Sequence, residues 1–432
     1  MEDSQLISKE TKKSRVLLKK YINKITHSKR QKNIKSNLKI YKHHKDNNKI
    51  KEKKINKNKQ NEIDNNQKII TKRNAGVDLL RIVTMIGIVY THVLNFKAIN
   101  IYTQYRDKLN NTYTYVFYHN NAYALISGIV GYKSTKYSNL LYLWLCVIFY
   151  SVGIRFYLKY KGGNIEGELY KEYFPVIYSR YWYFTSYFGM YIFLPAVNKG
   201  IQYLNKPEFK ALVMSMCGIF VVWQSYMNRK DDHFKMNGGS SPIWFLCIYI
   251  IGAYIGKYNV VYTGIKRYIF SFIYLFIFLF SSSLHNKYSI YTIIEYSENY
   301  KTKFKNFIKK LSSDNLICVI KLSQAISLAL LFLQLKYNKY LSKLITFVGP
   351  LTFAVYLIHD NHNIKLNYLN KLFDGESYNL TFNEVMQMLI LKCIKIFVGC
   401  IIIEYLRHLL FTTLKIRKIC IFIEKIFFKI IS

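Results

Sequence analysis

Long runs of apolar residues constrain the fold of this chain more than any other feature of its sequence. A bilayer core about 30 Å thick requires roughly 20 mostly apolar residues for each helix that crosses it. Ten segments approach this pattern, at 78–96, 115–132, 137–158, 181–197, 208–226, 241–257, 266–284, 315–335, 344–360 and 385–406. The sequence therefore predicts an all-α fold, a polytopic membrane helix bundle of about ten transmembrane helices, with the lipid bilayer as its surroundings.

Two of these segments carry a weaker signal than the others. The segment 115–132 contains two asparagines near its start. The segment 181–197 is interrupted by Gly189, and we expect it to end at Pro195 because proline cannot continue the hydrogen bonds of a helix.

The positive charge of the chain is concentrated at its beginning. The formal net charge is +39, and the first 73 residues hold 23 Lys and Arg against 7 Asp and Glu. Residues 1–74 have no apolar pattern that could offset their ordering entropy, so we expect a basic, low-complexity tail that is disordered or partly helical. Such a tail could tether the chain to anionic lipids, and we expect no specific nucleic-acid partner. Because basic residues near spans stay inside, ten spans place both termini in the cytoplasm.

The remainder of the chain divides into a predicted transmembrane domain at 75–406 and a basic amphipathic segment at 407–432. Isoleucines in the last segment recur at helical spacing opposite a lysine face, which is typical of a helix lying on the membrane surface. The seven cysteines occur singly and form no CxxC pair, so the sequence predicts neither a zinc module nor a disulfide framework. We expect no bound metal.

The first apolar segment contains two basic groups on one helical face. Arg81 and His92 are eleven residues apart, which brings their side chains to within about 20° of each other around a helix. Along the helix they are about 16 Å apart, with Arg81 near the cytoplasmic end. An ionisable residue inside a membrane is a candidate for a functional role. The structural alternative is that Arg81 anchors the helix and His92 lies among the lipid headgroups. Asp78 is well placed to cap this helix.

Other candidate residues lie near the ends of later segments. Ser127 and Gly128 are small residues within the second segment, and Lys133 emerges at its cytoplasmic end. Close helix packing explains Ser127 and Gly128 as well as a binding role does. His359 ends the ninth segment near the outer face, where it could orient a substrate, assist proton transfer or lie at the interface. His359 and His362 lack a third ligand nearby, which argues against a metal site.

Four motifs in order resemble those of the acyltransferase 3 family, the multi-spanning enzymes that acylate cell-surface glycans. RIVTMIGIVYTH is similar to the family's opening Arg-x10-His, and LISGIVGYK to its Ser-Gly-x4-Arg, with Lys133 in place of Arg. YWYFTSYFGMYIFLP resembles the aromatic span that ends in proline, and TFAVYLIHD the late Tyr-x-x-His. The matches extend from about residue 76 to residue 360 and leave the basic tail outside.

This resemblance implies a membrane O-acyltransferase that takes an acyl group, expected to be acetyl, from cytoplasmic acyl-CoA. The acceptor would be a hydroxyl of a surface or lipid-linked glycan, at the plasma membrane. Arg81 and Lys133, with Ser127 and Gly128, would bind acyl-CoA, because basic side chains bind phosphate. His92 would act either as a general base or as a transiently acylated nucleophile.

A different class of protein fits part of this pattern. A transporter or exporter of glycans or lipids would also place polar residues inside the membrane. Such a transporter usually contains paired broken helices in two repeated halves, and this sequence has no such pairing. A receptor-like scaffold that uses the basic tail is a third possibility. The sequence leaves the oligomeric state and the acceptor open.

Overall fold

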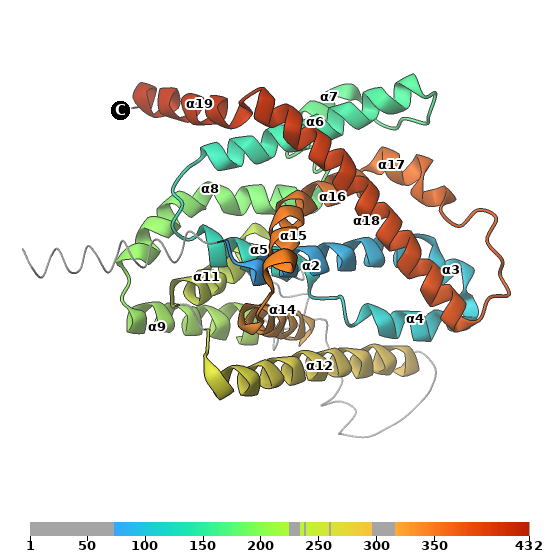
Figure 1. The fold of residues 1–432 in the computed structure, drawn as a ribbon, viewed down its shortest axis with the longest axis horizontal. Helices are drawn as coiled ribbons and strands as arrows, with labels where there is room; N and C mark the ends of the chain where they lie inside the picture. Colours follow the sequence, from blue (N-terminus) through green and yellow to red (C-terminus); the bar gives the residue numbers. More distant parts are fainter. Residues whose placement is uncertain (1–72, 224–233, 237–238, 259–260, 296–315, 432) are drawn as a thin grey trace, which may run out of the picture. The chain divides into compact units, whose positions relative to one another are not determined.

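A computed structural model describes residues 73–223, 234–236, 239–258, 261–295 and 316–431 (Figure 1). Within these ranges every regular element is a helix, and no strand occurs. The all-α prediction is therefore confirmed. The predicted disordered tail at 1–74 falls almost entirely outside the described residues.

Each of the ten predicted segments is largely helical where it is described. The longer helices are α2 (Ala75–Val93), α5 (His119–Gly131), α6 (Ser138–Tyr160), α8 (Trp182–Tyr203), α9 (Lys206–Met216), α11 (Pro242–Tyr258), α12 (Gly264–Glu295), α14 (Leu316–Gln334), α15 (Lys339–Val348), α18 (Phe382–Thr413) and α19 (Ile416–Ile431). The shorter ones are η1 (Leu94–Ala98), α3 (Ile99–Ile101), η2 (Thr103–Tyr105), α4 (Arg106–Tyr113), α7 (Leu169–Tyr173), η3 (Cys217–Trp223), η5 (Gly349–Leu351), α16 (Thr352–His359), α17 (His362–Asn367) and η6 (Leu369–Lys371).

Five helical stretches among the described residues are long and apolar enough to cross a membrane. They are α2, α6, the first part of α12, the run from α15 through η5 to α16, and α18. Helix α11 and the end of α14 are apolar but shorter. The chain is thus a polytopic helical membrane protein, and the number of ten crossings stays a prediction.

Three details of the helix ends differ from expectation. The side chain of Asn74, not Asp78, caps α2 by accepting from the Gly76 N–H at 2.8 Å, because Asp78 lies within the first turn and binds Arg81 instead. Helix α8 continues through Pro195 to Tyr203, since a proline inside a helix removes only one donor and can be accommodated. Helix α18 extends to Thr413, so the predicted boundary between residues 406 and 407 falls inside it.

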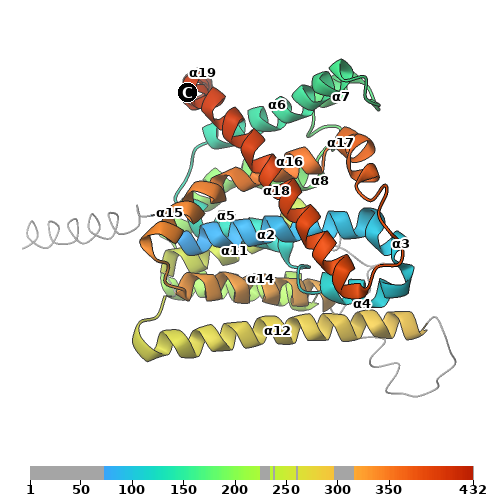
Figure 2. The ribbon, with the colours of Figure 1, turned by 45° about the vertical axis from the view of Figure 1, so that its right-hand side comes forward.

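Helix α2 occupies the centre of the bundle. It packs against α5, α14, α15, α16 and α18, and most of its residues are buried. Figure 1 and Figure 2 both show α18 crossing over α2, and α12 at the margin beside α14. Helix α12 exposes most of its apolar side chains, including Phe272 and Phe276, as expected for a helix that faces lipid.

Helices α5 and α11 approach each other without side chains between them. A Cβ atom added to Gly128 would collide with the carbonyl oxygen of Tyr249, and one added to Gly252 would collide with that of Leu125. Small residues permit this close backbone contact. At the start of α5, the Asn121 amide oxygen accepts from the Trp244 indole N–H at 3.0 Å, which adds a polar link to α11.

A buried ion pair joins α18 to α6. Glu404 and Arg407 are one turn apart on α18, and their side chains are about 5% exposed. The Nε–H and Nη2–H groups of Arg407 donate to the two carboxylate oxygens of Glu404. The Tyr150 hydroxyl donates to Glu404 at 2.6 Å, and Arg407 donates to the Tyr142 hydroxyl at 3.1 Å. We call these four residues the α6–α18 polar cluster. Each of their charged groups has a partner.

Helix α19 follows at a sharp turn in which Lys415 has a φ of 54°. It contacts α6 and α18, with Cys420 buried and many apolar side chains exposed, Ile430 among them at 78%. That residues 407–432 form a separate amphipathic segment stays a prediction.

Candidate active site

The two histidines that the sequence analysis selected are in contact. His92 comes from the last turns of α2 and His359 from the last residue of α16, and the Nδ1 atom of His92 lies 2.9 Å from the Nε2 atom of His359. Their ring centroids are 5.0 Å apart. His359 is only 2% exposed, so it is a buried partner of His92.

The hydrogen bonds fix which nitrogen of each ring carries a proton. The Nδ1 atom of His359 lies 2.5 Å from the carbonyl oxygen of Val355, which can only accept, so His359 is protonated at Nδ1. Its Nε2 atom then carries the lone pair and accepts from the Nδ1–H of His92. In the neutral state, the lone pair of His92 is therefore at Nε2, which makes this atom the basic and nucleophilic one.

Asp360 adds a negative charge beside the two rings. Its Oδ1 atom lies 3.3 Å from the Nδ1 atom of His92 and 2.5 Å from the ammonium of Lys365. The carboxylate is 6% exposed. A buried carboxylate next to an imidazole stabilises the imidazolium that forms when the ring takes up a proton. Asp360 is therefore placed to support proton uptake by His92.

A small, partly open pocket lies against His92. One face of α2 lines it through Met85, Ile88 and His92, which follow one another at helical spacing. The other lining residues come from α5, α8 and α16 and are mostly aromatic: Asn120, Tyr123, Trp182, Tyr183, Phe353 and Tyr356. An apolar pocket with a few polar groups is typical of a small-molecule site.

Arg81 lies toward the other end of α2, where its guanidinium binds Asp78 at 2.5 Å. The Tyr123 hydroxyl, from a residue that also lines the pocket, donates to the Arg81 carbonyl oxygen at 3.0 Å. Tyr123 thus links the surroundings of Arg81 to the pocket.

The other residues predicted to bind the donor lie in different surroundings. The Ser127 hydroxyl donates to the Tyr123 carbonyl oxygen at 2.8 Å and accepts from the Tyr187 hydroxyl at 3.2 Å, which places Ser127 near Arg81. Gly128 lies against α11, where packing explains it. Lys133 is exposed, with its ammonium 5.7 Å from the Tyr132 ring centre. No ion-pair network links Lys133 to Arg81 in the described part of the chain.

Three residues of the site were given no role by the sequence analysis, although Tyr356 is the tyrosine of the late Tyr-x-x-His motif: Asp360, Tyr183 and Tyr356. Asp360 follows His359 directly, and Tyr356 precedes it by three residues, which places it one helical turn away. These spacings could have identified both residues. Tyr183 lies on α8 in an aromatic-rich stretch, and its sequence context does not single it out.

The second histidine of the predicted pair contacts a different group. His362 is half exposed and lies 2.6 Å from Glu166, away from the ring of His92. In the described ranges, no group of three or more His, Cys, Asp or Glu side chains is placed to hold a metal ion. The prediction of a metal-free reaction stays a prediction.

Comparison with known families gives one match. A family model described as an acyltransferase domain matches residues 74–406, which is most of the chain and includes every residue of the site. No curated protein and no solved structure matches the chain.

Proposed function

The chain belongs to the acyltransferase 3 family and is a membrane acyltransferase, and from this premise we propose that it acetylates a glycan. In this proposal, acyl-CoA in the cytoplasm supplies the acyl group, with acetyl as the expected one. A hydroxyl of a surface or lipid-linked glycan accepts it, at the plasma membrane, with both termini of the protein in the cytoplasm.

The observation that carries this proposal is the contact between His92 and His359. It leaves the Nε2 lone pair of His92 directed away from His359, on a residue that lines the pocket. A base positioned within reach of a hydroxyl accelerates attack by removing its proton in the transition state. His92 is therefore our general base, and His359 is a positioning residue that sets its tautomer.

The proposed reaction proceeds in two steps. The acceptor oxygen attacks the carbonyl carbon of the thioester while His92 Nε2 takes the hydroxyl proton, and the carbonyl electrons move onto oxygen. The tetrahedral intermediate then collapses, the carbon–sulfur bond breaks, and the leaving thiolate takes the proton from His92. Asp360, 3.3 Å from Nδ1, stabilises the imidazolium between the two steps.

The donor would be held from the other end of α2. An arginine has five N–H donors, so Arg81 can bind Asp78 and still offer N–H groups to a phosphate. The axial rise between Arg81 and His92 is about 16 Å, which the pantetheine arm of acyl-CoA could cover along the route past Tyr123. Ser127 lies beside this route, and Lys133 would contribute its charge from the turn after α5.

The test is an assay on the full-length protein purified in detergent. Acetyl-CoA is added, and thiol release is followed with and without a glycan acceptor, beside the His92→Gln variant as control. We expect acetyl-CoA to bind and to be turned over by the wild type, and turnover to be lost in the variant. A protein that neither binds nor turns over any acyl-CoA would contradict the proposal and favour the transporter interpretation.

A further inference from the structure

Two tyrosine residues that line the pocket with His92 have buried hydroxyls whose O–H groups have no acceptor in the described part of the chain. The Oη atom of Tyr183 makes no hydrogen bond there, and the Oη atom of Tyr356 is approached only by the backbone N–H of Tyr183, which leaves its own O–H without an acceptor. A buried polar group normally has a partner, because its water is removed on burial and leaving it unpaired costs free energy. Two such groups side by side therefore require an explanation.

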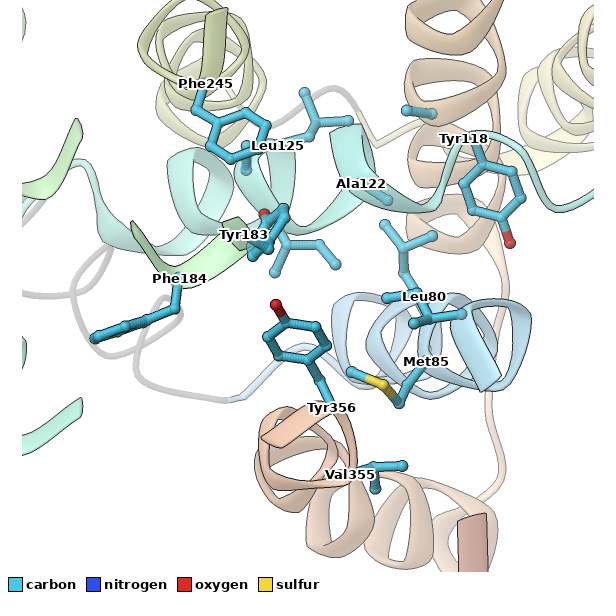
Figure 3. Packing of buried hydrophobic residues seen from close by; sticks show 14 of the residues in the cluster. Leu80, Met85, Tyr118, Ala122, Leu125, Tyr183, Phe184, Phe245, Val355 and Tyr356 are labelled. Carbon is cyan, nitrogen blue, oxygen red and sulfur yellow. The ribbon is translucent and has the colours of Figure 1, made fainter. Parts of the chain in front are cut away.

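The position of both rings connects them to the site. Tyr183 lies on α8 and Tyr356 on α16, their ring centroids are 6.2 Å apart, and both residues line the pocket with His92. Figure 3 shows the hydroxyl of Tyr356 pointing toward Tyr183. Tyr356 is one turn before His359, the residue that positions His92.

Other buried tyrosines of the bundle do have partners. The Tyr181 hydroxyl donates to the Leu357 carbonyl oxygen at 3.0 Å, and the Tyr249 hydroxyl donates to Asn198 at 2.9 Å. Tyr150 donates to Glu404. Missing acceptors are therefore not the rule for buried tyrosines in the described part of the chain, and of the three tyrosines that lack one, Tyr183 and Tyr356 line the pocket whereas Tyr258 does not.

We propose that Tyr183 and Tyr356 are catalytic residues that donate hydrogen bonds to the oxyanion of the tetrahedral intermediate. This inference rests on the proposed function. When the acceptor oxygen attacks, the thioester carbonyl oxygen becomes negatively charged, and two phenol O–H groups fixed in a pocket of low polarity stabilise that charge. Burial keeps both phenols neutral and therefore able to donate. When the carbon–sulfur bond breaks, the electron pair returns to form the ester carbonyl, and both protons stay on the tyrosines.

The arrangement separates the two tasks of the site. His92 moves the proton of the acceptor, and the two phenols bind the oxygen of the donor. The proton transfer to His92 and the negative charge on the carbonyl oxygen both develop in the transition state. Interactions that strengthen only there raise kcat and not only the affinity for the substrates.

The experiment compares Tyr183→Phe and Tyr356→Phe with the wild type in acetyl-CoA hydrolysis, in which water replaces the acceptor and the same oxyanion forms. Each substitution should lower kcat on the order of 10²-fold, with KM nearly unchanged. The inhibition constant of free CoA, which lacks the carbonyl, should also be unchanged. The thermal midpoint should change little, because neither hydroxyl donates a hydrogen bond within the described part of the chain.

Tyr258→Phe is the matched control. The Tyr258 hydroxyl is also buried without a partner in the described ranges, but it lies at the end of α11 and does not line the pocket. Its removal should leave kcat unchanged. His92→Gln, measured in the same assay, tests the proposed function separately from the oxyanion role of the two tyrosines. If His92→Gln abolishes hydrolysis while both pocket variants keep the wild-type kcat, the oxyanion role is wrong and the proposed function stands. An equal loss of kcat in Tyr258→Phe would also overturn the inference.

Discussion

Two groups of buried polar residues in this bundle differ in how completely they are paired. In the α6–α18 polar cluster, Glu404 and Arg407 bind each other, and Tyr150 and Tyr142 satisfy further atoms. Around His92, by contrast, one ring nitrogen carries a lone pair and two neighbouring phenols lack acceptors among the described residues. We infer that the paired groups of the α6–α18 polar cluster hold helices together, whereas the unpaired groups that line the pocket are available to a substrate. Substitutions in the two groups should therefore affect different quantities.

The largest effect is expected on the rate, from His92→Ala. Removing a positioned general base typically costs about 10²–10⁴-fold, so transfer from acetyl-CoA should nearly disappear. Donor binding should stay close to wild type, and the thermal midpoint should fall only slightly, because one hydrogen bond to His359 is lost and the His92 side chain is 21% exposed. Steady-state kinetics beside a thermal melt in detergent tests both expectations. A variant that unfolds more easily but keeps its kcat would place His92 with the structural cluster instead.

His359 provides a finer test within the same group. His359→Ala removes the acceptor for the Nδ1–H of His92 and should lower kcat, but less than the loss of His92 itself. His359→Gln should recover part of that rate, because its amide oxygen can accept the same hydrogen bond. If His359 served only for packing, both variants would have the same kcat. Measuring them together therefore distinguishes packing from a hydrogen bond that positions His92.

The opposite result is expected for the polar cluster. Glu404→Leu leaves the Arg407 charge buried without its partner, which should lower the free energy of unfolding by about 3–5 kcal/mol. The double variant Glu404→Leu, Arg407→Leu should recover most of this loss, because it removes both charges together. Thermal unfolding in detergent measures the effect, and kcat of the folded fraction should be unchanged. If the double variant is as unstable as the single one, the ion pair is not the reason.

The smallest effect is expected at Arg81, which lies outside both groups, is paired with Asp78 and is proposed to bind the donor. Arg81→Lys can keep the ion pair with Asp78 but loses the forked geometry for phosphate. We expect the KM for acetyl-CoA to rise about tenfold, the equivalent of one lost hydrogen bond to a charged group, with little change in stability. An unchanged KM in both Arg81→Lys and Arg81→Ala would remove this residue from the donor site and leave it as a partner of Asp78 alone.

The sequence predicted what depends on local periodicity. Apolar runs located the helices, and the motifs identified the family that the match at 74–406 confirms. The spacing of Arg81 and His92 along α2 followed from helical geometry. Their tertiary surroundings did not, because the contact of His92 with His359 joins residues 267 positions apart and depends on how α16 packs on α2. Which phenols lack an acceptor is likewise a property of three-dimensional packing.

Two predictions about helix ends were wrong for different reasons. Asp78 was expected to cap α2, but a carboxylate in the first turn also reaches a basic residue three positions later, and the charged partner prevailed over the backbone N–H groups. Pro195 was expected to end α8, but the surrounding helices continue to pack against that helix beyond it.

The close contact of α5 with α11 has a consequence for how the protein is made. Helix α5 has 13 residues and a length of about 20 Å, so it cannot span a core of about 30 Å alone. Helix α11, which packs on α5 through glycines, begins about 110 residues after α5 ends. A ribosome needs about 5–20 s to synthesise the residues between them. During that interval α5 has no partner for the backbone surface around Gly128. The wall of the pocket that carries Asn120 and Tyr123 can therefore be completed only after α11 has left the ribosome, which makes assembly of the active site a late event in membrane insertion.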